Sequence, residues 1–234
     1  MMDKMVRSRV AGVLLALALT VMLLAGVLYF LPTNDAYMLF LLKRHSTPAS
    51  SGLPEEAYPV AAEMIAAYLE GNIEEFQIVY MKDGVEYAAF NEREQQHMAD
   101  VQKLFALCRT VGLWGTSVSV VSLVSLLIDR DRKDLRYFRR GILGILALVT
   151  IVAMWAVIDF DSIFVLFHRI AFTNELWLLD PRTSMLIRLM PTNFFVEWVV
   201  LIGIVWLIGM LLAIILSWPV ELLLKLMNRK DENP

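Results

Sequence analysis

The chain has 234 residues, of which 58% are hydrophobic and 19% are charged. A soluble domain is usually closer to half apolar and a quarter charged, so this composition indicates a membrane protein. The net charge of -3, without a basic stripe, argues against nucleic-acid binding. The single cysteine, Cys108, excludes an internal disulfide framework and a multi-cysteine metal site.

Long apolar stretches dominate the chain. Four of them predict transmembrane helices, at about residues 10–31, 106–128, 141–158 and 197–220. Each is close to the roughly 20 residues that a helix needs to cross the hydrocarbon core, where only a helix or a closed barrel satisfies the backbone. The first stretch resembles a signal peptide, but it is longer than the usual apolar region and lacks a cleavage site. We therefore expect an uncleaved anchor within a single membrane domain, residues 1–234.

The first long connection, residues 32–103, is acidic and long enough for a small cap. A helix is predicted from Pro54 to Glu70, because proline and acidic residues favour a helix start and Gly71 favours its end. The segment from Phe76 to Phe90 alternates weakly around Lys82-Asp83-Gly84, which predicts a short β-hairpin.

A further helix is predicted just before the second membrane span. Asn91 can cap this helix, and Glu94 follows three residues later, which is the spacing of a capping box. Arg93, His97 and Asp100 stand at helical spacing and therefore share one face. His97 is thus expected among charged groups, near the end of a membrane helix.

Lysine and arginine gather in three places. These are the N-terminus, the second connection and the C-terminal tail, with Lys4, Arg7, Arg9, Arg130, Arg132, Lys133, Arg136, Arg139, Arg140, Lys225, Arg229 and Lys230. With four spans, all three places lie on one side, and the excess of positive charge marks that side as cytoplasmic. We expect both termini in the cytoplasm and the loops 32–103 and 159–195 on the outer face.

The second outer loop, residues 159–195, is strongly apolar but contains scattered polar residues. Such a segment is expected to lie in the membrane interface rather than to cross it, and Trp177 supports this because tryptophan prefers the headgroup level. Phe164, His168 and Phe172 stand four residues apart, which places His168 on an aromatic helix face.

The polar groups gather where the membrane meets the outer solvent. The uncharged centres of the spans argue against a transporter, which usually needs ionisable groups in the membrane. An enzyme that acts on lipid ester bonds would carry its groups at this level, but so would a protein that binds a partner. His97 and His168 are the candidates for acid–base chemistry, although either could serve only to pack or cap a helix. His45 is predicted to be a plain surface residue.

A metal site has weaker support. Glu94 and His97 have helical ligand spacing and His168 could add a third ligand, but no H-E-x-x-H motif or paired cysteine completes a shell. We expect neither a metal nor another cofactor, and we expect Cys108 to pack rather than react.

Two motifs carry a family resemblance. The first is Phe90-Asn91-Glu92-Arg93-Glu94-Gln95-Gln96-His97-Met98-Ala99-Asp100-Val101. The second runs from Phe167-His168-Arg169-Ile170-Ala171-Phe172-Thr173-Asn174 through Trp177, Leu179-Asp180-Pro181, Leu186-Ile187 and Pro191 to Phe194-Phe195. Together with the four spans, they resemble the lipoprotein intramolecular transacylase family of Gram-positive bacterial membranes. The chain departs from the family pattern at Ser184, where an acidic residue is expected.

The resemblance implies an all-α membrane protein with four transmembrane helices and an outer cap formed by the two loops. It implies that the sn-2 acyl chain of an S-diacylglyceryl N-terminal cysteine moves to the α-amino group of that cysteine, giving a lyso-lipoprotein. The implied partners are diacylglyceryl lipoproteins and membrane lipid, at the outer leaflet of the bacterial cytoplasmic membrane. The implied catalytic residues are His97 and His168. The implied residues that bind the substrate, stabilise the oxyanion or orient the reacting groups are Arg93, Glu94, Asp100, Arg169, Asn174, Trp177 and Asp180. Among them, Arg93, Arg169 or Asn174 could donate to the oxyanion.

The main alternative is a non-catalytic membrane subunit whose outer loops bind a partner or lipid. Such a subunit has no need for two histidines that meet in one place. The assignment of base and acid to His97 and His168, and the oligomeric state, stay open at this point.

Overall fold

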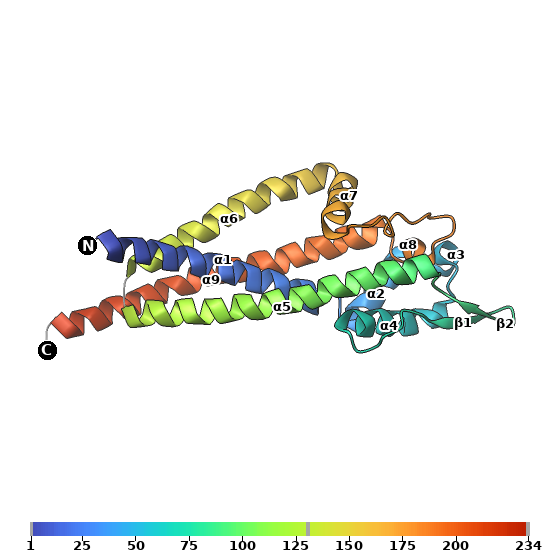
Figure 1. Cartoon of the computed structure of the whole chain (residues 1–234), viewed down its shortest axis with the longest axis horizontal. Helices are drawn as coiled ribbons and strands as arrows, with labels where there is room; N and C mark the ends of the chain where they lie inside the picture. Colours follow the sequence, from blue (N-terminus) through green and yellow to red (C-terminus); the bar gives the residue numbers. More distant parts are fainter. Residues whose placement is uncertain (1, 130–131, 233–234) are drawn as a thin grey trace. The chain divides into compact units, whose positions relative to one another are not determined.

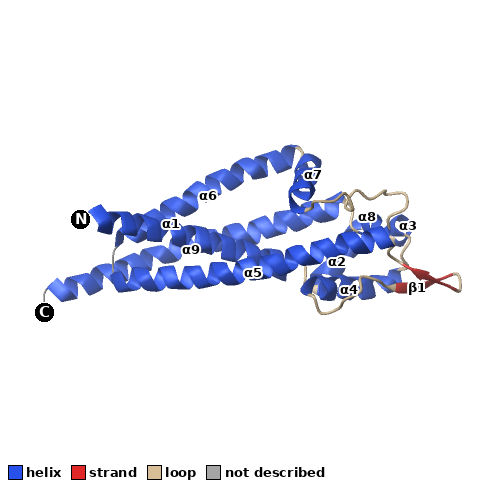
Figure 2. Cartoon of the chain, in the orientation of Figure 1, coloured by secondary structure: helices blue, strands red, loops and turns tan. Residues whose placement is uncertain are grey.

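The computed structural model describes residues 2–129 and 132–232 (Figure 1). Most of the described chain is helical, and its strands form one small hairpin (Figure 2). The helices are α1 (Met2–Phe30), α2 (Asp35–His45), α3 (Pro48–Ser51), a 3-10 turn (Glu55–Ala57), α4 (Tyr58–Glu70), α5 (Glu92–Asp129), α6 (Arg132–Ile158), α7 (Phe160–Ala171), α8 (Met185–Leu189) and α9 (Thr192–Glu232). The strands are β1 (Val79–Lys82) and β2 (Val85–Ala88). This confirms the predicted all-α membrane fold with a short hairpin.

The chain divides into two compact units. We call them the span unit, made of Met1–Val27, Arg109–Val157 and Gly203–Pro234, and the cap unit, made of Leu28–Cys108 and Ile158–Ile202.

Among the described residues, four helices are long and apolar enough to cross a membrane, as predicted. They cover Arg9–Phe30, Glu92–Ile128, Leu135–Ile158 and Thr192–Asn228. Two of these helices exceed the predicted spans, since α5 has 38 residues and α9 has 41. At 1.5 Å per residue, each is nearly twice as long as the roughly 30 Å thickness of the hydrocarbon core. On α5, the uncharged stretch begins only after Arg109, so its first turns extend beyond the apolar segment.

Small residues allow the helices of the span unit to approach closely. A Cβ atom added at Gly115 of α5 would lie 3.0 Å from the backbone nitrogen of Met22 and 3.1 Å from the carbonyl oxygen of Ala18 in α1. A Cβ atom at Gly141 of α6 would lie 2.8 Å from Cβ of Ala16. Such contacts are typical of helices packed within a bilayer, where dispersion forces and close backbone approach replace the hydrophobic effect.

An ion pair joins α6 to α9 within the span unit. Arg139 donates to the Glu221 carboxylate at 2.7 Å and to the Ser217 hydroxyl at 3.1 Å. Its guanidinium also lies over the Trp218 ring, 4.4 Å from the centroid. The predicted basic connection thus contributes at least one arginine to helix packing, while its residues 130 and 131 lie outside the described part of the chain.

The cap unit has its own apolar core, centred on α2 and α4. Fully buried members include Leu41, Leu42, Tyr58 and Ile65. The Tyr58 hydroxyl lies within hydrogen-bonding distance of the hydroxyls of two buried serines, so this polar group is satisfied inside the core. Helices α2 and α3 were not predicted, because α2 has only 11 residues and buries only three of them.

The segment before α5 agrees with the prediction in part. The helix expected from Pro54 is wrong at its start, since a 3-10 turn precedes α4, which begins at Tyr58. Its end is confirmed, with Gly71 in the left-handed conformation at φ 84°. The hairpin is also confirmed, and Asp83 and Gly84 form its turn with positive φ, as a two-residue hairpin turn requires.

The second long loop begins with helix α7. Asp159 caps α7 by accepting a hydrogen bond from the Ser162 backbone N–H at 3.0 Å. On α7, the large apolar side chains of Phe167 and Ile170 are exposed while His168 is buried. Helix α7 therefore presents an apolar face outward and its histidine inward.

Candidate active site

The first turns of α5 form one wall of the candidate site. Asn91 and Glu94 cap the helix reciprocally: the Glu94 N–H donates to the Asn91 side chain at 3.1 Å, and the Asn91 N–H donates to the Glu94 carboxylate at 2.7 Å. This is the predicted capping box. The buried Glu94 carboxylate also accepts from the Ser184 hydroxyl at 2.5 Å and from the Leu186 N–H at 2.8 Å. Glu94 thus joins α5 to the start of α8, and in this structure it binds protein groups.

The two candidate histidines meet within the cap unit. The ring centroids of His97 on α5 and His168 on α7 are 6.0 Å apart. Phe172 packs against both rings, at 5.2 Å from His97 and 5.6 Å from His168. Phe164 and Trp177 complete the surroundings of His168, with centroids at 4.2 Å and 5.0 Å. Residues 71 positions apart in sequence therefore form one aromatic-walled pair.

The tautomer of His168 follows from its hydrogen bond. Its Nδ1 lies 2.7 Å from the Phe164 carbonyl oxygen, which can only accept, so Nδ1 carries the proton. In the neutral ring, Nε2 then holds the free lone pair. Burial lowers the pKa of His168 from its ordinary value of 6.5, and the bond to the Phe164 carbonyl opposes this shift only in part. At physiological pH, His168 is therefore neutral, with a free lone pair on Nε2.

His97 is equally buried, with 8% of the residue exposed, and its Nδ1 has no hydrogen-bond partner. A buried N–H without an acceptor is rarer than a buried acceptor without a donor. The neutral form with its proton on Nε2 is therefore favoured, because Nδ1 is then only an unused acceptor. In that form, the Nε2–H of His97 is available as a hydrogen-bond donor.

Polar groups border the histidine pair, and they come from α5 and from the loop after α7. The Asp100 carboxylate accepts from the Asn174 side chain at 2.8 Å and from the Lys103 ammonium at 2.8 Å. Arg93 donates to the backbone carbonyl of Glu175. The loop that follows α7 is thus attached to α5 on the helical turns before and after His97.

Two of the predicted binding residues make other contacts. Arg169 lines a shallow hollow of about 340 Å³ on α7, together with Asp161, Ser162, Val165 and Leu166, and neither histidine is part of that lining. Asp180 accepts from the side chain and the backbone N–H of Arg182, which holds a turn before α8. The Arg182 guanidinium lowers the pKa of the Asp180 carboxyl. Sequence reasoning missed the Glu94–Ser184 contact, because nothing in the spacing links residues 90 positions apart.

The prediction that His45 is a plain surface residue is wrong. His45 is half-buried, and its Nε2 lies 2.7 Å from the Glu197 carboxylate, which also accepts from Arg44 at 2.8 Å. The ring packs edge-on against Phe194 at 6.4 Å. This histidine therefore joins α2 to α9 inside the cap unit.

A metal-binding cluster is not present in the described part of the chain: no three His, Cys, Asp or Glu side chains there are grouped to hold an ion. The chemistry of the candidate site is that of two neutral imidazoles between aromatic rings, bordered by charged groups. This arrangement suits proton transfer at an apolar substrate.

A model of the lipoprotein intramolecular transacylase (Lit) family matches residues 12–195, which is most of the chain. The chain belongs to the lipoprotein intramolecular transacylase family. As a Lit family member, it is a transferase that moves an acyl group within a lipoprotein. The alternative of a non-catalytic subunit is not favoured.

Solved structures share the fold of this Lit family member. The membrane-integral lipoprotein intramolecular transacylase Lit from Bacillus cereus matches with a TM-score of 0.71 and 18% identity, over 96% of this chain and 98% of that chain. A variant of the Bacillus cereus protein with one histidine replaced by arginine matches with a TM-score of 0.68 and 18% identity, over 98% and 96% of the two chains. A variant with alanine at that histidine matches with a TM-score of 0.68 and 18% identity, over 97% and 98%. The comparison with curated proteins found no match.

Proposed function

We propose that this Lit family member transfers the sn-2 acyl chain of an S-diacylglyceryl N-terminal cysteine to the α-amino group of the same cysteine. The observation that carries the proposal is the histidine pair, with ring centroids 6.0 Å apart among aromatic side chains. The ester and the amine belong to one substrate molecule, so holding both in place makes the reaction effectively unimolecular and needs no covalent enzyme intermediate.

The tautomers suggest a role for each histidine. The free Nε2 lone pair of His168 takes a proton from the nitrogen as the neutral amine attacks the ester carbonyl carbon. The Nε2–H of His97 donates to the carbonyl oxygen as it becomes an oxyanion. When the carbon–oxygen bond breaks, the protonated His168 returns the proton to the glyceryl oxygen. The products are an amide and a free hydroxyl, and both histidines regain their starting forms.

The site is proposed to lie at the outer leaflet, with both termini in the cytoplasm. The basic connections support this orientation, because lysine and arginine favour the cytoplasmic side. The exposed apolar side chains of Phe167 and Ile170 on α7 suit contact with acyl chains, as expected of an interfacial helix. A site at this level meets the lipid-bearing end of a lipoprotein, whose polypeptide extends into the outer solvent.

Mass spectrometry of lipoprotein N-termini tests the proposal. Cells that make the wild-type protein should contain lipoproteins with one N-linked and one glyceryl-linked acyl chain, and cells without it should keep the S-diacylglyceryl form with a free amine. The His97→Ala, His168→Ala double variant, at equal membrane level, is the matched control and should resemble cells without the protein. Diacylglyceryl lipoproteins that stay unmodified in the presence of the wild-type protein would refute the proposal.

A further inference from the structure

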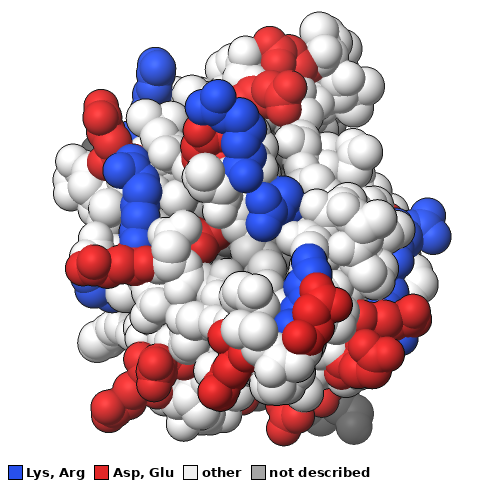
Figure 3. All heavy atoms as spheres, turned by 90° about the vertical axis from the view of Figure 1, so that its right-hand side faces the viewer, with Lys and Arg blue, Asp and Glu red and all other residues white. Residues whose placement is uncertain are grey.

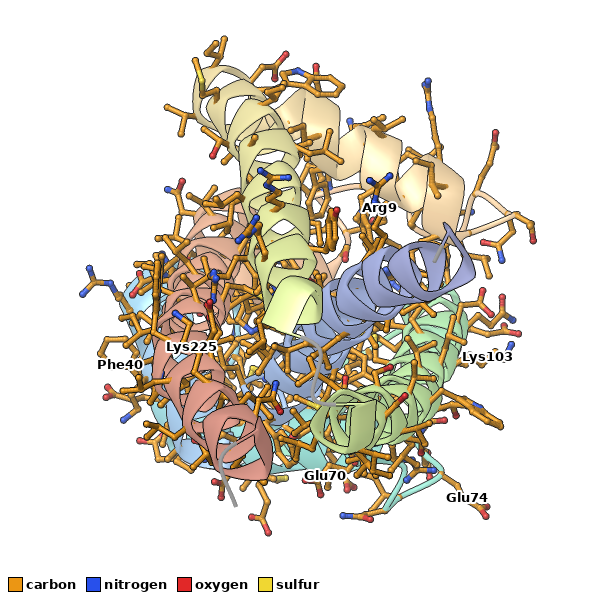
Figure 4. All side chains as sticks on the ribbon, turned by 90° about the vertical axis from the view of Figure 1, so that its left-hand side faces the viewer. Arg9, Phe40, Glu70, Glu74, Lys103 and Lys225 are labelled. Atoms are coloured by element: carbon orange, nitrogen blue, oxygen red, sulfur yellow. The ribbon has the colours of Figure 1, made fainter. Side chains whose placement is uncertain are left out.

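An ammonium group already occupies one oxygen of Asp100, one helical turn from His97. The Lys103 Nζ lies 2.8 Å from the Asp100 Oδ1, and the Asn174 Nδ2 lies 2.8 Å from the Asp100 Oδ2. The two partners differ in freedom. Lys103 has 76% of its side chain exposed, lies on the outside of α5 (Figure 4), and belongs to the same helix. Asn174 comes from the loop that also carries Trp177 against His168.

We infer that Asp100 is the docking site for the α-ammonium group of the substrate's N-terminal cysteine, and that the Lys103 ammonium holds this position until the substrate displaces it. The inference rests on the proposed function, because that function supplies a substrate with a primary amine. The Lys103 side chain is largely exposed, so its ion pair contributes little net stability and exchange of one ammonium for another is easy.

The position of Asp100 suits the reaction. Asp100 and His97 are three residues apart on α5, so their side chains lie on the same face of the helix. Only 21% of the Asp100 side chain is exposed, so its oxygens face the protein as well as the solvent. An amine held on the Oδ1 of Asp100 would therefore lie on the face of α5 that carries His97, one helical turn away.

Each proton of the substrate ammonium can be accounted for when Asp100 only binds it. The docked ammonium has one proton more than the attacking amine, and it loses this proton to bulk water at the exposed border of the site. The neutral nitrogen then forms the bond to the carbonyl carbon, and its second proton passes through His168 to the glyceryl oxygen. Asp100 stays ionised throughout, so it binds and positions the nitrogen and takes no part in bond breaking.

The charge of the cap unit also favours a cationic group. Acidic side chains outnumber basic ones in this unit, and in Figure 3 they predominate in the lower part of the face, while basic side chains lie among acidic ones in its upper part. A general attraction therefore acts beside the dock, and Asp100→Asn separates the two because it removes only the local carboxylate. A charged hydrogen bond of this kind is stronger than a neutral one.

The test measures binding of two lipopeptides that cannot react, because ether bonds replace both esters of the diacylglyceryl group. One probe has a free α-amine and the other an N-acetylated amine. The full-length wild-type protein in nanodiscs should bind the free-amine probe about tenfold more tightly. Asp100→Asn should bring this ratio to about one, since the amide still accepts from Asn174 but carries no charge. Lys103→Met should increase the ratio, because the internal competitor is gone, whereas the matched variant Lys82→Met in the hairpin should leave it unchanged.

The outcomes separate this inference from the proposed function. An unchanged binding ratio in Asp100→Asn, or a ratio in Lys103→Met no higher than in the wild type, would overturn the docking role while wild-type acyl transfer continues. Loss of the preference in Asp100→Asn with its gain in Lys103→Met would establish it. If the wild-type protein binds neither probe, both the inference and the proposed function fail.

Discussion

His97 and His168 differ in the ring nitrogen that each leaves available. His168 is oriented by a backbone carbonyl four residues earlier on its own helix, so its base nitrogen is defined by local structure. His97 has a buried Nδ1 without a partner. A proton on Nδ1 would be a buried donor without an acceptor, which is costly, so the proton lies on Nε2. Two residues of the same type can therefore have different roles, one as base and one as hydrogen-bond donor.

Replacement by glutamine should separate these roles. His97→Ala is expected to slow acyl transfer about 100- to 1,000-fold, as for loss of an oxyanion donor, and His97→Gln should restore part of the rate because its amide can donate. His168→Ala should cost about 100- to 10,000-fold, and His168→Gln should be equally slow because an amide is not a base. The rate of lyso-lipoprotein formation in proteoliposomes measures this. Equal rescue at both positions would contradict the assignment.

The thiol of Cys108 provides a second test of the mechanism. Cys108→Ser should retain nearly full acyl-transfer activity, because the substrate amine is the nucleophile and no acyl-enzyme forms. The same product assay measures it, with the membrane level of the variant as control. An inactive Cys108→Ser protein at normal level would point to a thioester intermediate.

The lowered pKa of His168 predicts how stability depends on pH. The folded pKa of His168 lies below the value of about 6.5 in the unfolded chain. Between these two values the unfolded state binds more protons, so stability is lost as the pH falls below about 6.5. The melting temperature of the wild-type protein in detergent should decrease in that range. His168→Gln should show a smaller decrease, and an identical pH dependence in the two proteins would contradict the shift.

Helix α5 links the site to the membrane. It is long enough to carry His97 and Asp100 on its first turns and an uncharged segment on its later turns. The Glu94 carboxylate attaches α8 to these first turns. This contact gives a physical reason for Ser184 at the position where the family pattern has an acidic residue. The Ser184 hydroxyl donates to Glu94 at 2.5 Å, whereas an ionised acid at that position would repel it.

Loss of the Glu94 contacts should loosen the cap. Glu94→Ala leaves the buried Ser184 hydroxyl and the Leu186 N–H without their acceptor, so a loss of about 1–3 kcal/mol in the free energy of unfolding is expected. The exposed neighbour Glu92 is the matched control, and Glu92→Ala should change stability by less than about 0.5 kcal/mol. Denaturation in detergent micelles measures both variants. Equal effects would show that Glu94 has no special part in holding α8.

Close helix packing in the span unit leads to a separate prediction about the stability of two glycine variants. Gly115→Ala would place a methyl group 3.0 Å from the Met22 nitrogen, and overpacking of this kind costs about 1–3 kcal/mol. Gly144 on α6 has no atom within 4 Å of an added Cβ, so Gly144→Ala should be neutral or stabilise by up to about 1 kcal/mol. Thermal unfolding of the two variants measures the difference. A Gly115→Ala protein as stable as Gly144→Ala would contradict close contact between α1 and α5.

The orientation of the whole protein in the membrane is a prediction from charge. Single cysteines introduced by Gly52→Cys and Asn174→Cys, on a Cys108→Ser background, should react with an impermeant thiol reagent in intact cells. Arg136→Cys, in the basic connection, should react only after permeabilisation. This pattern follows from the excess of lysine and arginine on one side of the spans. Labelling of position 52 only after permeabilisation would reverse the orientation and place the histidines on the cytoplasmic side.

The amino-acid sequence alone determined the four spans, a hairpin around Lys82-Asp83-Gly84 and the capping box at Asn91. Each is a local property: an apolar run of sufficient length, a pair of residues that tolerate positive φ, and two side chains three residues apart. The histidine pair was anticipated because both residues fall at span ends on one predicted side, and the family motifs include both. Helices α2 and α3 were missed, because the apolar residues of α2 form one short continuous run without helical periodicity and α3 has only four residues.

Only the tertiary structure decided which polar groups meet. The Glu94 contact with Ser184, the Asn174 contact with Asp100 and the contact of His45 with Glu197 all join residues far apart in sequence. No periodicity records such pairs, because they form when apolar burial brings separate helices together and each buried polar atom must then find a partner. The same rule defines the tautomer of His168, whose partner is a backbone oxygen of its own helix. The buried Nδ1 of His97, which has no partner, is an exception to this rule inside the candidate site.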